Sequence, residues 1–384
     1  QLPAFIDYMK VRGSFSSVGM PYPRNLTSPT YEYDETNQGW KPKTHYPIGD
    51  LKPERTNSFE VGMNMRFLKN FELDVTYYNA KTMNQTFNPE LPVGEYARIY
   101  IQTGAVRNQG LELALNYNNT WKDFTWNTGV TYSMNKNKIL TLADNAINPI
   151  TGEKFSISSL NMGGLGSTRF ILKEGGSMGD IYSLMDLKRD ANGAVYIDEN
   201  NSVVTESLEA NNYIKLGSVL PKGNLAWRNN FSWKNINVAF LVSARLGGVV
   251  FSRTQAVLDN FGVSEASAAA RDKGYVSVNG NDRVNPEGWY SVVAGGTAVP
   301  QYYIYSATNI RLQEASIGYT IPRKWLGNVC DIKVSLIGRN LWMIYNKAPF
   351  DPESVASTDN FYQGIDYFMM PSLRNIGFNL SFKF

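Results

Sequence analysis

This chain of 384 residues has very little of the chemistry on which many sites depend, with one cysteine and one histidine. With Cys330 alone, no internal disulfide and no multi-cysteine metal site is possible. With His45 alone, a histidine-pair metal site is excluded and a Ser-His-Asp triad is improbable. No run of 18 apolar residues occurs, so no transmembrane helix is expected. The net charge of +3 is small and dispersed, and gives no reason to expect a nucleic-acid partner.

What the sequence does contain is alternation, most clearly in its last ten residues. Apolar side chains recur at every second position there, with small or polar side chains between them: Ile376, Phe378, Leu380, Phe382 and Phe384 against Asn375, Gly377, Asn379, Ser381 and Lys383. A period of two with one apolar and one polar face is typical of a barrel strand between lipid and an aqueous lumen. The alternative is an edge strand of a soluble sandwich, which the same pattern also fits.

The same alternation recurs along the chain, for example at Phe59–Phe67, Phe71–Tyr77, Leu111–Tyr117 and Val238–Leu246. One-sided strands in a soluble protein need a second layer to bury them, and no segment reads as a helix that could provide it. We therefore predict an all-β fold, a transmembrane antiparallel β-barrel. The 23 Tyr, 19 Phe and 8 Trp would form girdles at the two membrane interfaces, or alternatively an ordinary β core.

About twelve strands are expected, joined by connections that alternate between short and long. Their expected ranges are Lys10–Gly19, Thr56–Phe67, Phe71–Gln85, Val106–Asn118, Phe124–Ile139, Arg169–Glu174, Met178–Leu187, Asn224–Trp233, Asn237–Leu246, Asn309–Thr320, Asp331–Trp342 and Asn375–Phe384. Outer-membrane barrels have short periplasmic turns and long outer loops. If the last strand ends at the periplasm, every short connection lies on that side, with Ile321–Cys330 as the one longer connection there.

Motifs for catalysis or cofactor binding are not found. Met162–Gly166 is rich in glycine but is not followed by Lys-Ser or Lys-Thr, so it does not predict a phosphate-binding loop. Asp190 to Asp198 is similar to a calcium loop, but Ala194 stands where a ligand is needed and no closing Glu follows. A hairpin turn at Asn192-Gly193 explains that segment better. We expect no enzyme activity, no metal and no cofactor.

A series of short motifs resembles one family of transporters. The motifs are L-K-P-E-R-T-N-S-F-E-V-G at Leu51–Gly62, N-Q-G-L-E-L at Asn108–Leu113, N-K-N-K-I at Asn135–Ile139, M-G-D-I-Y at Met178–Tyr182, L-G-S-V-L-P-K-G-N at Leu216–Asn224, A-S-I-G-Y-T-I-P at Ala315–Pro322, G-R-N-L-W at Gly338–Trp342 and D-P-E at Asp351–Glu353. In this order they resemble the carboxy-terminal half of SusC/RagA-type TonB-dependent outer-membrane transporters of Bacteroidetes. One departure is Ser183-Leu184, where the family usually has Gly-Tyr.

The resemblance implies a barrel of about twenty-two strands that is filled by an amino-terminal plug. Because the chain starts at Gln1 without an initiator Met or a signal peptide, residues 1–384 are expected to be the carboxy-terminal part of such a barrel. The implied partners are a SusD-like surface lipoprotein as a lid, the TonB complex acting through the missing amino-terminal part, and outer-membrane lipid. The implied cargo is an oligosaccharide or a peptide, and the assembly would be a dimer of transporter–lid pairs.

Two sets of residues are candidates for contact with plug and cargo. Charged side chains on the polar strand faces would point toward the lumen and the plug: Glu60, Arg66, Glu72, Asp74 and Glu112. The alternative for each is a solvated charge without a special role. Aromatic side chains in the long connections would stack on cargo, or else form a girdle or contact the lid: Trp289, Tyr290, Tyr302, Phe361 and Tyr362.

Other functions remain open at this point. A passive or structural barrel would share the strand pattern, and a siderophore or cobalamin receptor would share the broader transporter class. A secreted soluble β-rich domain is the remaining alternative.

Overall fold

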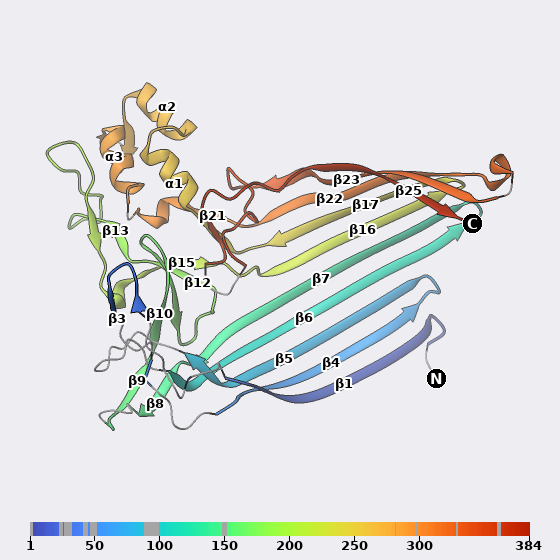
Figure 1. The fold of residues 1–384 in the computed structure, drawn as a ribbon, viewed down its shortest axis with the longest axis horizontal. Helices are drawn as coiled ribbons and strands as arrows, with labels where there is room; N and C mark the ends of the chain where they lie inside the picture. Colours follow the sequence, from blue (N-terminus) through green and yellow to red (C-terminus); the bar gives the residue numbers. More distant parts are fainter. Residues whose placement is uncertain are drawn as a thin grey trace.

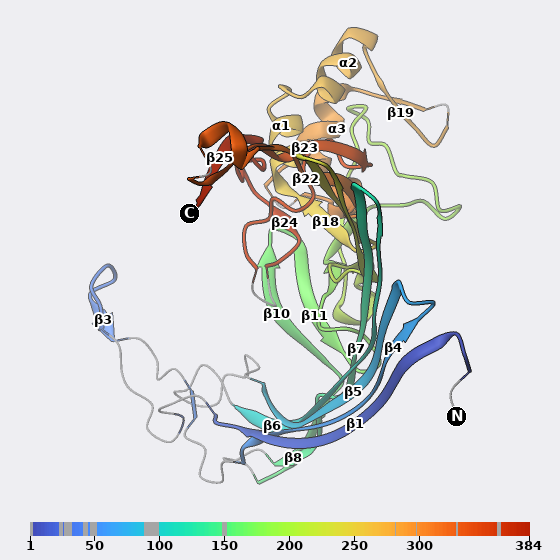
Figure 2. The same ribbon diagram turned by 90° about the vertical axis from the view of Figure 1, so that its right-hand side faces the viewer.

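The computed structural model describes residues 3–22, 26, 33–40, 45–46, 52–87, 100–147, 152–280, 282–296, 298–327, 329–358 and 362–384. Its main feature is one ten-stranded antiparallel sheet of long strands, which curves strongly (Figures 1 and 2). In sheet order the strands are β1 (Ile6–Met20), β4 (Glu54–Phe67), β5 (Phe71–Phe87), β6 (Ile101–Trp121), β7 (Phe124–Thr141), β16 (Gly223–Trp233), β17 (Ile236–Leu246), β22 (Asn309–Ile321), β23 (Asp331–Asn346) and β25 (Asn375–Lys383). These are ten of the twelve expected strands. Each of them pairs with the long strands that precede and follow it in the sequence.

Short hairpins join these strands at one end of the sheet, and long connections leave from the other end (Figure 1). The β6–β7 and β16–β17 turns contain two residues each, with Lys122 at φ 51° and Lys234 at φ 50°. Positive φ is what a two-residue hairpin turn requires if its twist is to match that of the strands. The predicted alternation of short and long connections is confirmed for these ten strands.

The expected pair Arg169–Glu174 and Met178–Leu187 does not belong to this sheet. Those residues form β11 (Thr168–Lys173) and β12 (Asp180–Ser183), which lie in a separate four-stranded sheet with β10 (Ser159–Leu165) and β15 (Ile214–Ser218). Phe170, Ile171 and Leu172 are consecutive and all buried. A strand that is buried on both faces belongs inside a packed unit, and the prediction of two barrel strands here was wrong.

The long connections fold into a region at one end of the sheet that contains helices (Figure 1). The helices are α1 (Arg253–Asn260), α2 (Glu265–Lys273) and α3 (Pro286–Val293), with 3-10 turns η1 (Ala210–Asn212), η2 (Pro300–Tyr303) and η3 (Arg323–Leu326). The remaining strands are short: β2 (Tyr33–Asp34), β3 (Gly39–Trp40), β8 (Ala143–Ile147), β9 (Lys154–Ile157), β13 (Met185–Leu187), β14 (Thr205–Ser207), β18 (Val249–Ser252), β19 (Val276–Val278), β20 (Asp282–Val284), β21 (Ile304–Ser306) and β24 (Ile365–Asp366). The expectation of a chain without helices was therefore wrong for 253–293.

Each helix begins at a side chain that accepts a backbone N–H. Ser252 accepts from Gln255, Ser264 forms a capping box with Ser267, and Asn285 accepts from Glu287 ahead of a proline at the first helical position. These caps satisfy amide groups that would otherwise lack partners at the helix start. No helix among the described residues is long and apolar enough to cross a membrane.

The buried core lies in the loop region, whereas one face of the long strands is apolar and exposed. A cluster of buried side chains joins β11, β12, β18, α1, α3 and η2, with Phe170, Phe251, Val293 and Tyr303 among its members. By contrast, Phe15, Ile376 and Phe378 on the sheet are 71%, 71% and 81% exposed. In the described structure no second layer covers this face, so the sandwich alternative fails, because it would bury these residues.

Aromatic side chains form a row on this apolar face near the short turns. Phe67 stacks on Phe71 with ring centroids 5.2 Å apart, Phe71 lies 4.7 Å from Tyr117, and Trp126 stacks on Phe231 at 6.1 Å. The row crosses β4, β5, β6, β7 and β16. Its position, at one border of an apolar band, is that of an interfacial girdle in a membrane barrel.

Candidate functional site

The charged residues singled out by alternation share one face of the sheet. Arg66 pairs across strands with Glu72, and Thr76 pairs with Glu112. Because directly paired residues project from the same face and the side-chain period is two, Glu60, Arg66, Glu72, Asp74 and Glu112 all lie on that face. It is the concave face, where the loop elements lie in Figure 2.

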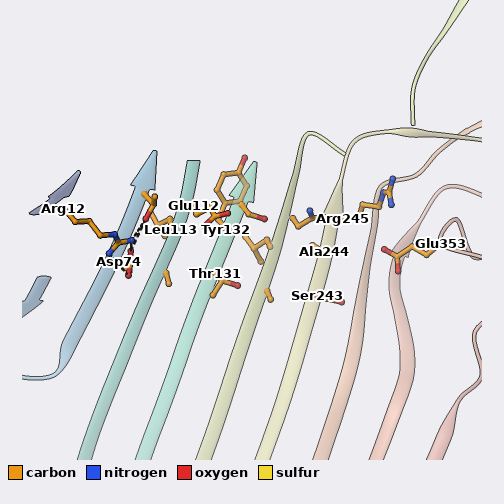
Figure 3. A pocket seen from close by; sticks show the side chains of 16 residues that line it. Arg12, Asp74, Glu112, Leu113, Thr131, Tyr132, Ser243, Ala244, Arg245 and Glu353 are labelled. Atoms are coloured by element: carbon orange, nitrogen blue, oxygen red, sulfur yellow. Dashed lines mark hydrogen bonds and ion pairs between the residues drawn. The ribbon is translucent and has the colours of Figure 1, made fainter. Parts of the chain in front are cut away.

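Arg12 on β1 completes an ion pair on this face that sequence reasoning missed. Its Nη2 lies 3.0 Å from Asp74 Oδ1 (Figure 3). Its guanidinium also donates to Asn64 and Thr76. The period-two pattern of Lys10–Gly19 placed Arg12 on a strand, but only the β1–β4 register, with Arg12 opposite Gly62, brings it to Asp74. Gly62 leaves room for the guanidinium, because a Cβ there would lie 2.7 Å from Arg12 Nε.

A hollow of about 520 Å³, lined by charged, polar and apolar residues, extends from this pair across the concave wall. Asp74 and Glu112 line one side and Arg245 and Glu353 the other (Figure 3). Arg245 donates to the backbone carbonyl of Val219 at 2.7 Å. The hollow thus offers hydrogen-bond donors and acceptors of both charge signs beside apolar surface, which suits a partner or cargo that carries polar groups.

A buried arginine fastens the last long connection to the same wall. Arg311 on β22 is 5% exposed, and its Nη2 lies 2.9 Å from Asp351 Oδ1 and 2.9 Å from Glu353 Oε2. Burial opposes ionisation of Asp351, but hydrogen bonds from Arg311 and Ser372 outweigh it and hold the pKa of this carboxyl below its ordinary value. The Asp-Pro-Glu motif is therefore the acidic half of an anchor, which we call the Arg311 anchor.

The aromatic candidates fall into two places. Trp289 on α3 and Tyr302 on η2 make an edge contact with ring centroids 5.2 Å apart, and Tyr302 is 40% exposed. Tyr290 lines a hollow between the helices together with Asp259 and Arg271. Tyr362 lies elsewhere, 6.4 Å from Phe170 of β11, and Phe361 lies outside the described residues. The structure thus brings Trp289 and Tyr302 into contact, while Tyr290 lines a separate hollow.

A tyrosine hydroxyl is protonated at neutral pH and can donate hydrogen bonds, and burial raises the pKa of Tyr290 and of Tyr302 further above its ordinary value. The neighbouring Tyr303 is different, because it is 2% exposed and its hydroxyl donates to Asp259 Oδ2 at 3.0 Å. It is a structural residue of the loop core.

The segment that is similar to a calcium loop is a hairpin turn. Asp190 Oδ1 accepts hydrogen bonds from the backbone N–H groups of Asn192 and Ala194, and Gly193 has φ 83°. Arg189 and Val195 bridge across the turn. A carboxylate used in this way closes an Asx turn. Within the described ranges, no group of three or more His, Cys, Asp or Glu side chains could hold a metal ion.

Comparisons with known proteins assign this chain to one family. A family model described as "TonB dependent receptor-like, beta-barrel" matches residues 4–248. TonB-dependent receptor P3 of Formosa agariphila is 26% identical over 382 residues, which cover 89% of this chain and 35% of that protein. TonB-dependent receptor P26 of the same organism is 27% identical over 360 residues, covering 87% of this chain and 35% of that protein. The chain thus spans about a third of the length of these curated relatives.

Among solved structures, a chain of the RagAB peptide transporter superposes on this one with a TM-score of 0.73 at 16% sequence identity. The match covers 100% of this chain and 42% of that chain. The expected barrel fold and the expected membership of the TonB-dependent receptor family are both confirmed. This chain belongs to the TonB-dependent receptor family as part of its β-barrel, in the outer membrane.

Proposed function

We propose that residues 1–384 are the carboxy-terminal part of the barrel of a SusC-like active importer. The observation that carries this proposal is the division of the sheet into an exposed apolar convex face and a polar concave face with a hollow of about 520 Å³. Such a wall separates lipid from an aqueous path that polar cargo can follow. Import against a gradient needs energy, which in this proposal reaches the barrel from TonB through a plug.

The experiment compares nutrient uptake by cells with and without the gene for the full-length protein. We expect the deletion strain to lose growth on one class of polymer, either oligosaccharides or peptides, and a protonophore to stop uptake in the wild type. No enzyme activity is part of this proposal. Uptake that survives the protonophore would favour a passive barrel, and loss of iron or cobalamin uptake alone would favour a siderophore or cobalamin receptor.

In this proposal the concave charges of β4 and β5 hold the plug. Arg66 stacks over the ring of Tyr8 at 5.2 Å and faces Glu72 across the strands, while Glu60 lies further along the same face. Neutralising all three, as E60Q/R66Q/E72Q, removes charge-assisted hydrogen bonds to a plug. We expect transport to change severalfold while the barrel still assembles; unchanged transport in the uptake assay would leave these residues as solvated lumen charges.

Cargo contact is assigned to the aromatic group of the loop region. Tyr302 presents its ring and a protonated hydroxyl beside Trp289, an arrangement that suits either the apolar face of a sugar or a peptide side chain. Y302A should weaken cargo binding about tenfold, measured by titration calorimetry on the full-length protein. Y302F keeps the ring and should bind nearly as well; equal affinity of Y302A and wild type would contradict the assignment.

A surface lipoprotein of the SusD type is proposed as the lid over this end of the barrel, in dimers of transporter–lid pairs. The support is the size of the loop region, which extends beyond the long strands at the end opposite the short turns (Figure 1). Affinity purification of the full-length protein from gently solubilised outer membranes should recover a lipoprotein in equal amount. Recovery of the barrel alone would argue against the lid.

A further inference from the structure

Cations on the convex face gather in one place. Lys81 on β5 lies directly opposite Arg107 on β6, which lies directly opposite Lys138 on β7. In the next row toward the short turns, Asn79 lies opposite Gln109, which lies opposite Lys136. We call Lys81, Arg107, Lys136 and Lys138 the convex cation row. Like charges directly opposite one another destabilise a sheet, so this arrangement calls for a compensating anion.

The described part of the chain does not supply that anion. Every Asp and Glu of β4, β5, β6 and β7 that the structure describes lies on the concave face, including Glu112 and Asp74. None of the four cations makes an ion pair or a side-chain hydrogen bond with a described residue, and Arg107 Nε is buried without a hydrogen-bond partner. A buried, unpaired guanidinium N–H is costly unless a ligand satisfies it.

The row lies at the height of the outer lipid headgroups. Directly below it toward the short turns is an apolar row, Tyr77, Leu111 and Met134. From Phe71 in the aromatic girdle to Lys81, the strand rises roughly 33 Å, which at a tilt of about 40° corresponds to about 25 Å across the membrane. That is the thickness of the apolar band of a membrane barrel, and the row therefore marks its outer border.

We infer that the convex cation row binds the phosphate of an anionic lipid in the outer leaflet, whose acyl chains lie on the apolar rows below. Arg107 supplies a planar fork suited to two phosphate oxygens, and the lysines supply point charges on either side. The choice of a lipid over a soluble anion follows from the continuity of the cations with the exposed apolar surface that acyl chains must cover. This inference does not depend on the cargo or the lid.

The test is native mass spectrometry of the full-length transporter in phosphatidylcholine nanodiscs that contain a purified phosphorylated lipid A. We expect the wild type to retain at least one lipid A, and K81Q/R107Q/K138Q to bind it about 100-fold more weakly, since each cation near a membrane surface adds roughly a factor of five. The control is K69Q/K122Q/K234Q, which removes the same charge from three short turns at the opposite end and should bind as the wild type does.

Two further measurements distinguish a lipid site from a soluble-anion site and show which results overturn the inference. Added inorganic phosphate should not displace the lipid; complete displacement would overturn the lipid assignment in favour of a soluble-anion site. The measurement on the wild type can be interpreted without the variant. If the wild type retains no lipid A, the inference is overturned even where the triple variant does not assemble. Equal retention by the wild type and an assembled K81Q/R107Q/K138Q variant overturns it as well.

Discussion

Replacing Arg311 by methionine should release the connection between β23 and β24 from the barrel wall. The Arg311 anchor joins a side chain that is 5% exposed to Asp351, whose carboxylate has little access to water. Removing one partner of a buried ion pair leaves an uncompensated charge, which costs about 3 kcal/mol or more. Amide exchange in 350–356 should then speed up on the order of 100-fold if it proceeds by local opening.

Hydrogen–deuterium exchange on the full-length protein measures this directly. The amide of Ala356, which donates to the carbonyl of Ile365 at 2.8 Å, and that of Ser354, which donates to Asp351, report on the connection. The control is R339M. Arg339 on β23 contacts Glu314 on β22, the strand that carries Arg311, at 2.8 Å. The Arg339 side chain is 67% exposed, so this loss should cost less than about 1 kcal/mol. Equal exchange in R311M and wild type would show that Arg311 does not anchor this segment.

The stabilisation by the Arg311 anchor should be lost at low pH. The pKa of Asp351 in the folded protein lies below its ordinary value of 3.8. A carboxyl with a depressed pKa stabilises the fold at pH values above the unfolded pKa, and the contribution is lost as pH falls through the folded pKa. The anchor should therefore be intact from neutral pH down to about pH 4 and loosen only below it. In R311M the hydrogen bond and the charge of Arg311 are lost while burial and the hydrogen bonds from Ser372 and the Glu353 backbone remain, so the pKa of Asp351 should be higher than in the wild type.

Period-two patterns were sufficient to locate the ten long strands because each pattern is local and nearly unbroken, with Leu241 a clear exception in Val238–Leu246. The alternation from Asn375 to Phe384 and that from Phe59 to Phe67 require no knowledge of the rest of the chain. The segment around Phe170 misled for an identifiable reason, since three consecutive apolar residues there indicate a strand buried on both faces rather than on one.

The three loop helices were missed although their starting signals are present. Ser264 with Ser267, and Asn285 followed by Pro286, are typical helix starts, and Gly274 ends α2 in the left-handed conformation. Each helix spans only eight or nine residues, too short for a 3.6-residue period to stand out. Their stability depends on tertiary packing around Val293 and Tyr303, which no local pattern predicts.

Side-chain contacts between strands could not be predicted from the sequence for a different reason. The polar face of each strand could be predicted, and with it the concave position of Glu112 and Asp74. The pairing of Arg12 with Asp74, and the alignment of Lys81, Arg107 and Lys138, depend on the register between strands. Register is set by turn geometry and by the sum of all cross-strand pairs, so a single strand's sequence does not reveal it.

An arginine on the convex face of β6 should strongly lower the stability of the folded barrel, whereas an arginine at the next residue should not. Leu113 lies on β6 about midway between the aromatic girdle and the convex cation row, opposite Val75 and Tyr132. Ala114, the next residue, lines the concave hollow opposite Asp74. L113R puts a charge near the middle of the lipid band at a cost of about 2–4 kcal/mol, whereas A114R puts it in water beside a carboxylate.

The measurement is urea-dependent folding of the two full-length variants into lipid vesicles, followed by the heat-modifiable shift in gel migration. We expect a lower unfolding midpoint for L113R and a midpoint near that of the wild type for A114R. The two sites share a strand, its hairpin and its neighbours, so any damage from inserting a long side chain into β6 affects both. The difference between them therefore reports only which face meets lipid, and equal midpoints would remove the basis for assigning the convex face to the membrane.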